Sequence, residues 1–154
     1  MSRHRVFVGL GSNLGDSRQL LAEAVEGLPG LVAVSNLFET APIGGPEQPP
    51  FLNLVAELAT DLGPYQVLDA CRALERAADR VRRERWGPRT LDVDVLLYDD
   101  LLLVDDTLTI PHPRMWERAF VLAPLHQLAP ALVSAGQLQA VEDQKILDLG
   151  PFPG

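Results

Sequence analysis

The sequence predicts an α+β fold of the ferredoxin-like βαββαβ type, in which two helices pack on an antiparallel sheet, with further elements added at the C-terminus. The first observation is the order of the periodic segments, since strand-like and helix-like patterns follow one another as βαββαβ over residues 5–98. The second is composition: 154 residues, 47% of them apolar and 22% charged, are typical of one compact domain, which we expect to span residues 1–154. The third is the single cysteine, Cys71, which cannot build a disulfide framework, so an apolar core must hold the fold together.

Four apolar segments of strand length are separated by turn residues or by helical patterns. They are expected to form strands at residues 6–10, 31–38, 51–60 and 91–98. Residues 11–15 follow the first strand and are turn-prone, since they include two glycines, a serine and an asparagine. The segment 40–50 is too rich in proline and glycine for regular structure, so we expect a binding loop there.

Three segments have the apolar spacing of a helix. The first begins after Asp16, a capping residue, and ends at a proline-glycine pair. The second begins with Pro64, which suits the first position of a helix, and its apolar residues recur up to Ala78. The third is expected at residues 117–128, whereas the stretch 132–154 is weakly patterned and predicts no particular element.

The charge is negative overall but positive in one segment. Thirteen basic and 21 acidic residues give a net charge of −8, which argues against binding to a nucleic-acid backbone or to an anionic membrane. Seven of the basic residues nevertheless lie close together, namely Arg72, Arg76, Arg80, Arg82, Arg83, Arg85 and Arg89. Every basic residue other than Lys145 is an arginine, and the planar guanidinium suits bidentate recognition of phosphate. The sequence therefore predicts a local anionic ligand.

No apolar run approaches the roughly 18 residues that span a membrane. We therefore expect no membrane segment and no secretion signal. Together with the lone Cys71, which indicates a reducing compartment, this predicts a cytoplasmic protein.

The strand expected at residues 91–98 carries two aspartates, Asp92 and Asp94. Because alternate residues of a strand point to the same face, their carboxylates share a face and can converge on a cation. Oxygen ligands without cysteine or clustered histidine favour magnesium or manganese over zinc. The ordinary alternative is a strand end that turns polar towards solvent. The metal site is favoured because the opposite face would be buried, carrying Leu91, Val93, Val95 and Leu97.

The arginine-rich segment also has two interpretations. Cations near the C-terminal end of a helix are favourable for the helix dipole alone, and this ordinary interpretation suits Arg72 and Arg76. It fits less well around Trp86, a large aromatic residue beside Gly87 and Pro88 that no apolar pattern buries. Arginines, an aromatic ring and two metal-binding carboxylates together indicate a nucleoside-triphosphate site.

Motifs that follow one another between about residues 6 and 130 carry a further signal. They are Gly11-Ser12-Asn13-Leu14-Gly15-Asp16, Thr40-x-Pro42-x-Gly44, Gln48-Pro49, Phe51-Leu52-Asn53, Glu75, Arg80-x-Arg82, Arg85-Trp86-Gly87-Pro88-Arg89-Thr90-Leu91-Asp92-x-Asp94 and Pro111-His112-Pro113-Arg114-Met115-x-x-Arg118-x-Phe120. In this order they resemble the 6-hydroxymethyl-7,8-dihydropterin pyrophosphokinases of folate biosynthesis. By this resemblance the protein would transfer the β,γ-diphosphate of ATP to the hydroxymethyl oxygen of the pterin and release AMP.

The resemblance implies a role for each matched residue. Two magnesium ions would be held by Asp92 and Asp94, which would form the catalytic set with Arg80, Arg82 and Arg89. ATP would be bound by Arg72, Glu75, Arg82, Arg85, Trp86, Arg89, Val95, Thr109, His112 and Arg118. The pterin would be bound by Thr40, Pro42, Ile43, Phe51, Asn53, Trp86 and Phe120. Aromatic faces and a few in-plane hydrogen-bond partners suit a flat, amide-rich ring. The two substrates would be the only partners, and we expect a monomer.

Ordinary alternatives exist for single residues and for the whole chain. Phe51 and Phe120 could be core residues, and His112 could brace a proline-rich turn. The rival functions are a ferredoxin-like binding module and a metal-dependent phosphohydrolase that uses Asp92 and Asp94. An assay with the pterin, magnesium and ATP separates them, because only the kinase yields AMP together with pterin diphosphate. No residue stands out as a general base, so the favoured mechanism is a hydroxyl polarised by the metal, with Asp94 as its proton acceptor.

Overall fold

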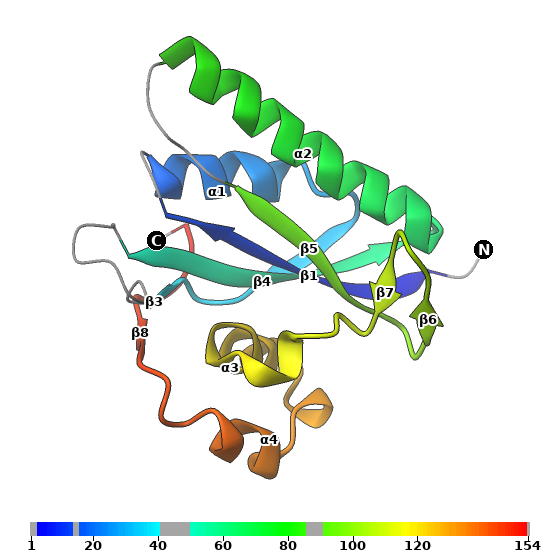
Figure 1. Ribbon diagram of the computed structural model, residues 1–154, viewed down its shortest axis with the longest axis vertical. Coiled ribbons are helices and arrows are strands. Elements are labelled where there is room, and N and C mark those ends of the chain that lie inside the picture. Colours follow the sequence, from blue (N-terminus) through cyan, green and yellow to red (C-terminus); the bar gives the residue numbers. More distant parts are fainter. Residues whose placement is uncertain (1–2, 14–15, 41–49, 86–90, 154) are drawn as a thin grey trace.

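The computed structural model describes residues 3–13, 16–40, 50–85 and 91–153, with side chains described through residue 79 in the third of these segments. One antiparallel sheet organises them, in the strand order β5, β1, β4, β3, β8, with β2 also paired to β4 (Figure 1). The strands are β1 His4–Ser12, β2 Leu31–Val34, β3 Phe38–Thr40, β4 Phe51–Thr60, β5 Asp92–Tyr98 and β8 Ile146–Asp148. The order confirms the predicted ferredoxin-like fold, because the first and last strands of the βαββαβ unit are antiparallel neighbours.

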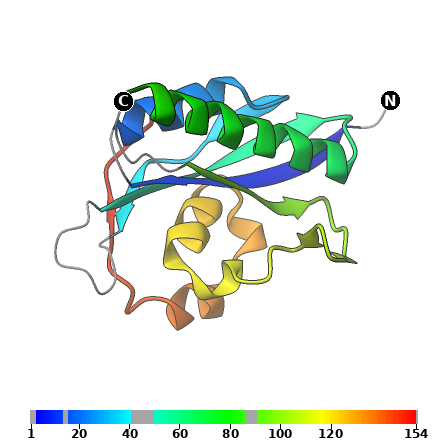
Figure 2. The ribbon, with the colours of Figure 1, turned by 45° about the horizontal axis from the view of Figure 1, so that its top comes forward.

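Helices cover both faces of the sheet, as Figure 2 shows. One face carries α1 Ser17–Glu26 and α2 Pro64–Arg85, and the other carries η1 Met115–Glu117, α3 Ala119–Leu128, η2 Pro130–Leu132 and α4 Ala135–Ala140. Each face has a core of its own. Leu21 of α1 packs with Val8 of β1 on the first face, and Leu122 of α3 packs with Phe7 of β1 on the second. The two layers follow from the alternation of side chains along a strand.

The strand predicted at residues 31–38 is wrong as one continuous element. The structure divides it into β2 and β3, both of which pair with β4. Between them the Ser35 hydroxyl accepts a hydrogen bond from the Val55 N–H at 2.9 Å, and the Ser35 N–H donates to the Val55 carbonyl at 2.9 Å. The serine side chain thus takes the place of a strand carbonyl, and the backbone can bend without leaving Val55 unpaired.

Two further predictions need correction along β1 and β5. Residues 11 and 12 belong to β1 and not to the predicted turn, and Gly11 pairs with Asn53 and with Asp92. In β5 a register shift opposite Phe7 interrupts the strict alternation. Leu97 therefore packs beside the second core, on the side of the aspartates, and not on the opposite face as expected.

The C-terminal stretch forms elements that its weak pattern did not predict. Helix α4 is capped by Ser134 and Gln137, each of which hydrogen-bonds the backbone of the other. Strand β8 then extends the sheet beside β3. The helix expected at residues 117–128 is instead the turn η1 followed by α3, with Arg118 in an extended conformation between them.

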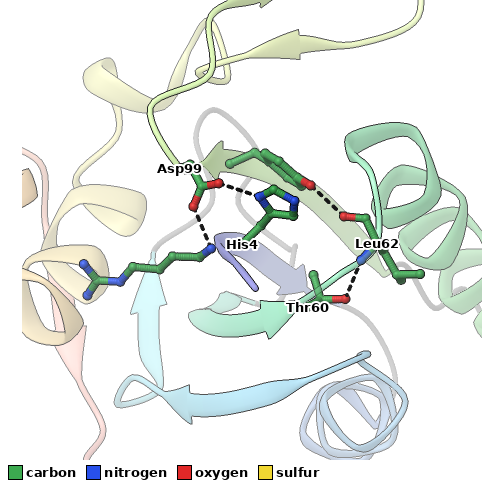
Figure 3. Close-up of polar contacts among 6 residues, drawn as sticks. His4, Thr60, Leu62 and Asp99 are labelled. Atoms are coloured by element: carbon green, nitrogen blue, oxygen red, sulfur yellow. Dashed lines mark hydrogen bonds and ion pairs between the residues drawn. The ribbon is translucent and has the colours of Figure 1, made fainter. Parts of the chain in front are cut away.

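A short hairpin of β6 Leu103–Val104 and β7 Thr109–Ile110 follows β5. At this end of the sheet a set of polar contacts joins β1, β5 and the start of α2 (Figure 3). Asp99 accepts hydrogen bonds from His4 Nδ1 at 2.7 Å and from the Arg5 N–H at 2.8 Å. The Tyr98 hydroxyl donates to the Leu62 carbonyl at 2.6 Å. Among the described helices, none combines the length and the hydropathy needed to cross a membrane.

Candidate active site

The two aspartates of β5 line a cavity of about 740 Å³ between the sheet and α3. Partial burial raises the pKa of Asp92 and the charge of Asp94 raises it further, while Arg118 acts in the opposite direction. A bound cation would offset the repulsion between these two carboxylates, and ligands that are all oxygen atoms suit magnesium. In the part of the chain that the structure describes, no three His, Cys, Asp or Glu side chains come together to hold an ion. Oxygen atoms of a bound ligand would therefore have to complete the coordination.

Glycines of β1 leave the space for this cavity. On the face of β1 that carries Phe7 of the second core, the next two residues along the strand are Gly9 and Gly11, and both line the cavity. A Cβ atom at Gly11 would lie 2.8 Å from Oδ1 of Asn53, and one at Gly9 would lie 3.4 Å from the Leu96 side chain. Side chains at these positions would thus fill the gap between β4 and β5.

Polar and aromatic side chains of β3 and β4 form one wall. Asn53 is buried, and its Nδ2 donates a hydrogen bond to the Thr40 hydroxyl at 3.1 Å. This bond orients the amide, and its carbonyl oxygen lies on the side of Gly11, a residue that lines the same cavity. Phe51 pairs with Thr40 and is only partly buried. The wall suits a flat heterocycle that carries amide-like donors.

The segment that begins α3 forms another wall. The guanidinium carbon of Arg118 lies 5.5 Å from the centroid of the Phe120 ring, within the range of a cation–π contact. Phe120 is partly buried and lines the cavity. The wall therefore offers an aromatic ring and a cation to the same cavity as the two carboxylates of β5.

A second cavity, of about 340 Å³, lies among α2, β5 and the β6–β7 hairpin, and it shares Asp94 and His112 with the first. Its other lining residues include Arg72, Glu75, Val95 and Thr109. Glu75 Oε2 accepts a hydrogen bond from the Val93 N–H at 2.9 Å.

The charge of Glu75 is set by opposing effects. Burial raises the pKa of Glu75 and the bond from Val93 lowers it, while Asp94 and Asp92 add to the rise and Arg72 counters it. A ligand in this cavity thus meets one acidic and one basic side chain at neighbouring positions of α2.

His112 sits where the two cavities meet. Its backbone N–H donates to the Leu96 carbonyl at 3.0 Å, and its Nδ1 accepts a hydrogen bond from the Arg114 N–H at 3.2 Å. Burial lowers the pKa of His112 most, Asp94 opposes the change, and Arg118 and Arg114 lower the pKa further. The imidazole is therefore neutral at pH 7, and since Nδ1 accepts, Nε2 carries the proton and can donate to an anionic ligand.

Residues 7–130 match the family model described as 7,8-dihydro-6-hydroxymethylpterin-pyrophosphokinase (HPPK). The chain belongs to the HPPK family. The family predicted from the sequence motifs is thereby confirmed, and so is the expected class of activity, a pyrophosphokinase of folate biosynthesis.

Relatives and a solved structure agree with this assignment. The chain is 51% identical over 133 residues to a 2-amino-4-hydroxy-6-hydroxymethyldihydropteridine pyrophosphokinase of Pseudomonas aeruginosa, covering 83% of this chain and 82% of the relative. It is 46% identical over 138 residues to the protein of the same name from Methylorubrum extorquens, covering 86% and 87%. The HPPK-DHPS of Plasmodium falciparum, crystallised with pterin and p-hydroxybenzoate, is similar in fold alone, with a TM-score of 0.60 at 15% identity. That likeness covers 83% of this chain but only 40% of the longer protein.

The structure brings most of the predicted HPPK site residues together. The first cavity is lined by Thr40, Phe51, Asn53, Asp92, Asp94, His112, Arg118 and Phe120, and the second by Arg72, Glu75, Asp94, Val95, Thr109 and His112. Phe51 and Phe120 are both partly buried and line the first cavity, and Phe120 also packs against the second core. Seven predicted residues lie outside what the structure describes. Four of them, Pro42, Ile43, Trp86 and Arg89, are outside the described residues, and the side chains of Arg80, Arg82 and Arg85 at the end of α2 are not described.

Sequence reasoning gave no site role to several lining residues of the first cavity, among them Gly11, Arg114, Glu117 and Gln144. Gly11 was assigned to a turn, and its strand position becomes evident only from its two neighbouring strands. Arg114 and Glu117 lie within the motif that contains Arg118, so their position in the motif was an available signal. Gln144 lies in the weakly patterned C-terminal stretch, and nothing in its sequence neighbourhood distinguishes it.

Proposed function

We propose that the protein transfers the β,γ-diphosphate of ATP to the hydroxymethyl oxygen of 6-hydroxymethyl-7,8-dihydropterin, releasing AMP, and that the reaction depends on magnesium. The observation that carries this proposal is the pair of adjoining cavities that share Asp94 and His112. One cavity has the aromatic and amide groups that a pterin needs, and the other has the mixed polar lining that a nucleotide needs. Diphosphate transfer requires the two substrates to meet, and they would meet at the residues that line both cavities.

In the nucleotide cavity, Arg72, Glu75, Val95 and Thr109 would bind the nucleoside portion of ATP. The phosphates would extend towards His112, whose Nε2–H can donate to them, and towards Arg118. Arg82, Arg85 and Arg89 would add further positive charge, and Trp86 would contribute an aromatic surface. This division is supported by the lining of the second cavity, which includes the cationic Arg72 together with the uncharged Val95 and Thr109.

In the pterin cavity, Phe51 and Phe120 would contact the faces of the ring. Asn53, held by Thr40, would accept a hydrogen bond from an amide donor in the ring plane. A buried amide that is already oriented loses little conformational entropy on binding, so it favours one orientation of the pterin. Pro42, Ile43 and Trp86 would complete the pocket.

The carboxylates of Asp92 and Asp94 would hold two magnesium ions together with phosphate oxygens, as the oxygen-only donor set allows. When bound, the ions neutralise charge that develops on the transferred phosphates and polarise the attacking hydroxyl. Arg80, Arg82 and Arg89 would stabilise the same charge. Asp94 would accept the hydroxyl proton, because it lies at the junction of the two cavities. Exclusion of water would then limit hydrolysis of ATP.

Domain organisation, oligomeric state, location and partners concern the whole chain. We propose that residues 1–154 form one domain, that the enzyme acts as a monomer in the cytoplasm, and that its partners are its two substrates and not nucleic acid. The net charge of −8 supports the last point.

The reaction is tested by identifying its products. The protein is incubated with the pterin, magnesium and ATP, and the products are separated and weighed by mass spectrometry. The proposal predicts equal amounts of AMP and pterin diphosphate. ADP with pterin monophosphate would contradict the transfer of two phosphates, phosphate or diphosphate without a pterin product would indicate a hydrolase, and no product would indicate a binding module.

A further inference from the structure

Gln144 reaches across from the C-terminal segment and bonds the backbone on both sides of Arg118. Its Oε1 accepts a hydrogen bond from the Ala119 N–H at 2.8 Å, and its Nε2 donates to the Glu117 carbonyl at 2.8 Å. The two bonds bridge 25 and 27 positions of sequence. A single side chain thus ties down the two peptide groups that flank one residue of the proposed site.

The bridged junction has no side-chain cap of its own. Arg118 is the N-cap of α3, has an extended backbone with φ −123° and ψ 111°, and makes no capping bond with its side chain. The first N–H groups of a helix have no partner within it, so the Ala119 N–H requires an acceptor from elsewhere. Gln144 supplies that acceptor, and it also restrains the peptide before Arg118.

The position of Gln144 is itself restrained by its neighbours. Its backbone N–H donates to the Val141 carbonyl at 3.0 Å, and Val141 is buried in the second core. Two residues further along the chain, Ile146 begins strand β8, which pairs with β3. The glutamine therefore connects the Arg118 junction to the second core and to the edge of the sheet.

The direction of the Arg118 side chain depends on the two backbone dihedrals at that residue. The guanidinium lies against Phe120 and acts on Asp92, so a small rotation at the junction would move its charge relative to the carboxylates. Misplacement by about 1 Å of a group that contacts the reacting phosphates can cost about 10²-fold in rate. Gln144 is exposed and belongs to neither apolar core, so its substitution leaves the cores intact.

We propose that Gln144 is a positioning residue, which holds the η1–α3 junction so that Arg118 points at the site where the phosphates are transferred. The inference rests on the proposed function, because that function gives Arg118 its contact with the phosphates. Gln144 itself is not assigned to either substrate, since both polar atoms of its side chain are used by the backbone.

The test compares Gln144→Met with Gln139→Met. Methionine is unbranched and similar in length to glutamine, but it cannot replace the two bonds. Gln139 is an exposed residue of α4 that lines neither cavity, so it controls for adding methionine to the same segment. The variants are compared with the wild-type protein by amide hydrogen exchange at Ala119 and by kcat/KM for the pterin.

The proposal predicts that Gln144→Met speeds exchange of the Ala119 amide and lowers kcat/KM by about three- to tenfold, the range that one or two hydrogen bonds support. Gln139→Met should change neither quantity. In an Arg118→Ala background the same Gln144→Met substitution should lower kcat/KM by less than about twofold, because the residue through which it acts is gone. A general loss of structure would add to the effect of Arg118→Ala instead.

Two results would overturn the proposal: unchanged exchange at Ala119, or an equal loss of kcat/KM with and without Arg118. Failure of the proposed function has a different signature, since the wild-type protein would then form no pterin diphosphate. In that case the positioning role is judged by exchange at Ala119 and by affinity for a non-hydrolysable ATP analogue. Gln144→Met should weaken that affinity in the wild-type background alone, and an unchanged affinity would count against the role.

Discussion

The two ends of β5 place aspartates in opposite electrostatic surroundings. At one end, burial alone would raise the pKa of Asp99, but the hydrogen bonds from His4 and from the Arg5 N–H outweigh it and lower the pKa. At the other end, burial and the charge of Asp94 raise the pKa of Asp92, with Arg118 as the opposing cation. The carboxylate of Asp99 is therefore stabilised by hydrogen bonds from the protein itself, whereas the carboxylates of Asp92 and Asp94 repel each other.

The difference assigns separate tasks to the two ends. The Asp99 end fastens β1 to the turn after β5, and the neighbouring Tyr98 hydroxyl bonds the carbonyl of Leu62 before α2. The Asp92 end carries glycines on β1, and two cavities adjoin its aspartates. A charge arrangement that does not stabilise the unliganded protein is expected where a ligand or metal later compensates it.

The largest effect is expected from removing the carboxylate charge of Asp94, which lines both cavities. Asp94→Asn should reduce magnesium-dependent turnover by about 10²-fold or more, the scale of losing one group that stabilises the transferred charge. The free energy of unfolding should fall little or rise, since repulsion with Asp92 is relieved. Steady-state kinetics at saturating magnesium and urea unfolding measure the two quantities. Near-normal turnover would remove the basis for the metal assignment.

The pterin side is tested by removing its oriented amide. Asn53→Ala should weaken pterin binding by roughly 1–3 kcal/mol, because a polar group of the ligand is left without a partner. Affinity for an ATP analogue should change little, since Asn53 lines only the first cavity. Titration calorimetry with each ligand provides the comparison. Equal losses for both ligands would instead make Asn53 a structural residue.

A smaller effect is expected from filling the gap on β1. Gly11→Ala would place a Cβ atom 2.8 Å from Oδ1 of Asn53, which is closer than real Cβ contacts, so the amide must shift. We expect pterin affinity to fall by about 1 kcal/mol, the size of one weakened hydrogen bond. Gly63→Ala is a matched control, because Gly63 has an ordinary neighbour distance of 3.6 Å and lines neither cavity. Equal pterin affinity in the two variants would show that pterin binding does not depend on the space left by Gly11.

Much of the fold could be predicted because its signals are local. The apolar alternation of β4 and the proline at the start of α2 lie within single segments of sequence. The break at Ser35 could not be predicted in this way, since it depends on a hydrogen bond with Val55 twenty residues away. The shift that moves Leu97 to the other face depends in the same way on the pairing of β5 with β1.

The site shows the same limit. Asp92 and Asp94 were predictable from their spacing on one strand, and a motif marked His112 and Arg118. The proposed role of Gln144 depends on the contact of its side chain with the backbone 25 residues earlier, and such a contact leaves no periodic pattern in the sequence. Its detection requires the three-dimensional structure.

The dependence of stability on pH follows from the same two aspartates with opposite signs. Because the pKa of Asp92 is raised in the folded, unliganded protein, its protonated carboxyl stabilises the fold at low pH. This stabilisation is lost as the pH rises past the ordinary aspartate value of about 4. The lowered pKa of Asp99 means that its contribution is present above that value and is lost as the pH falls below it. At pH 7 the Asp92 carboxylate therefore opposes folding and the Asp99 carboxylate supports it.

The most direct measurement is urea unfolding of Asp92→Asn and Asp99→Asn at pH 7, with and without magnesium and an ATP analogue. The account predicts that unliganded Asp92→Asn is at least as stable as the wild-type protein and gains little from the ligands. Asp99→Asn should be less stable by about 1 kcal/mol, the scale of its solvent-accessible hydrogen bonds, and should keep the full stabilisation by ligands. Equal destabilisation of the two variants, or full ligand stabilisation of Asp92→Asn, would contradict the account.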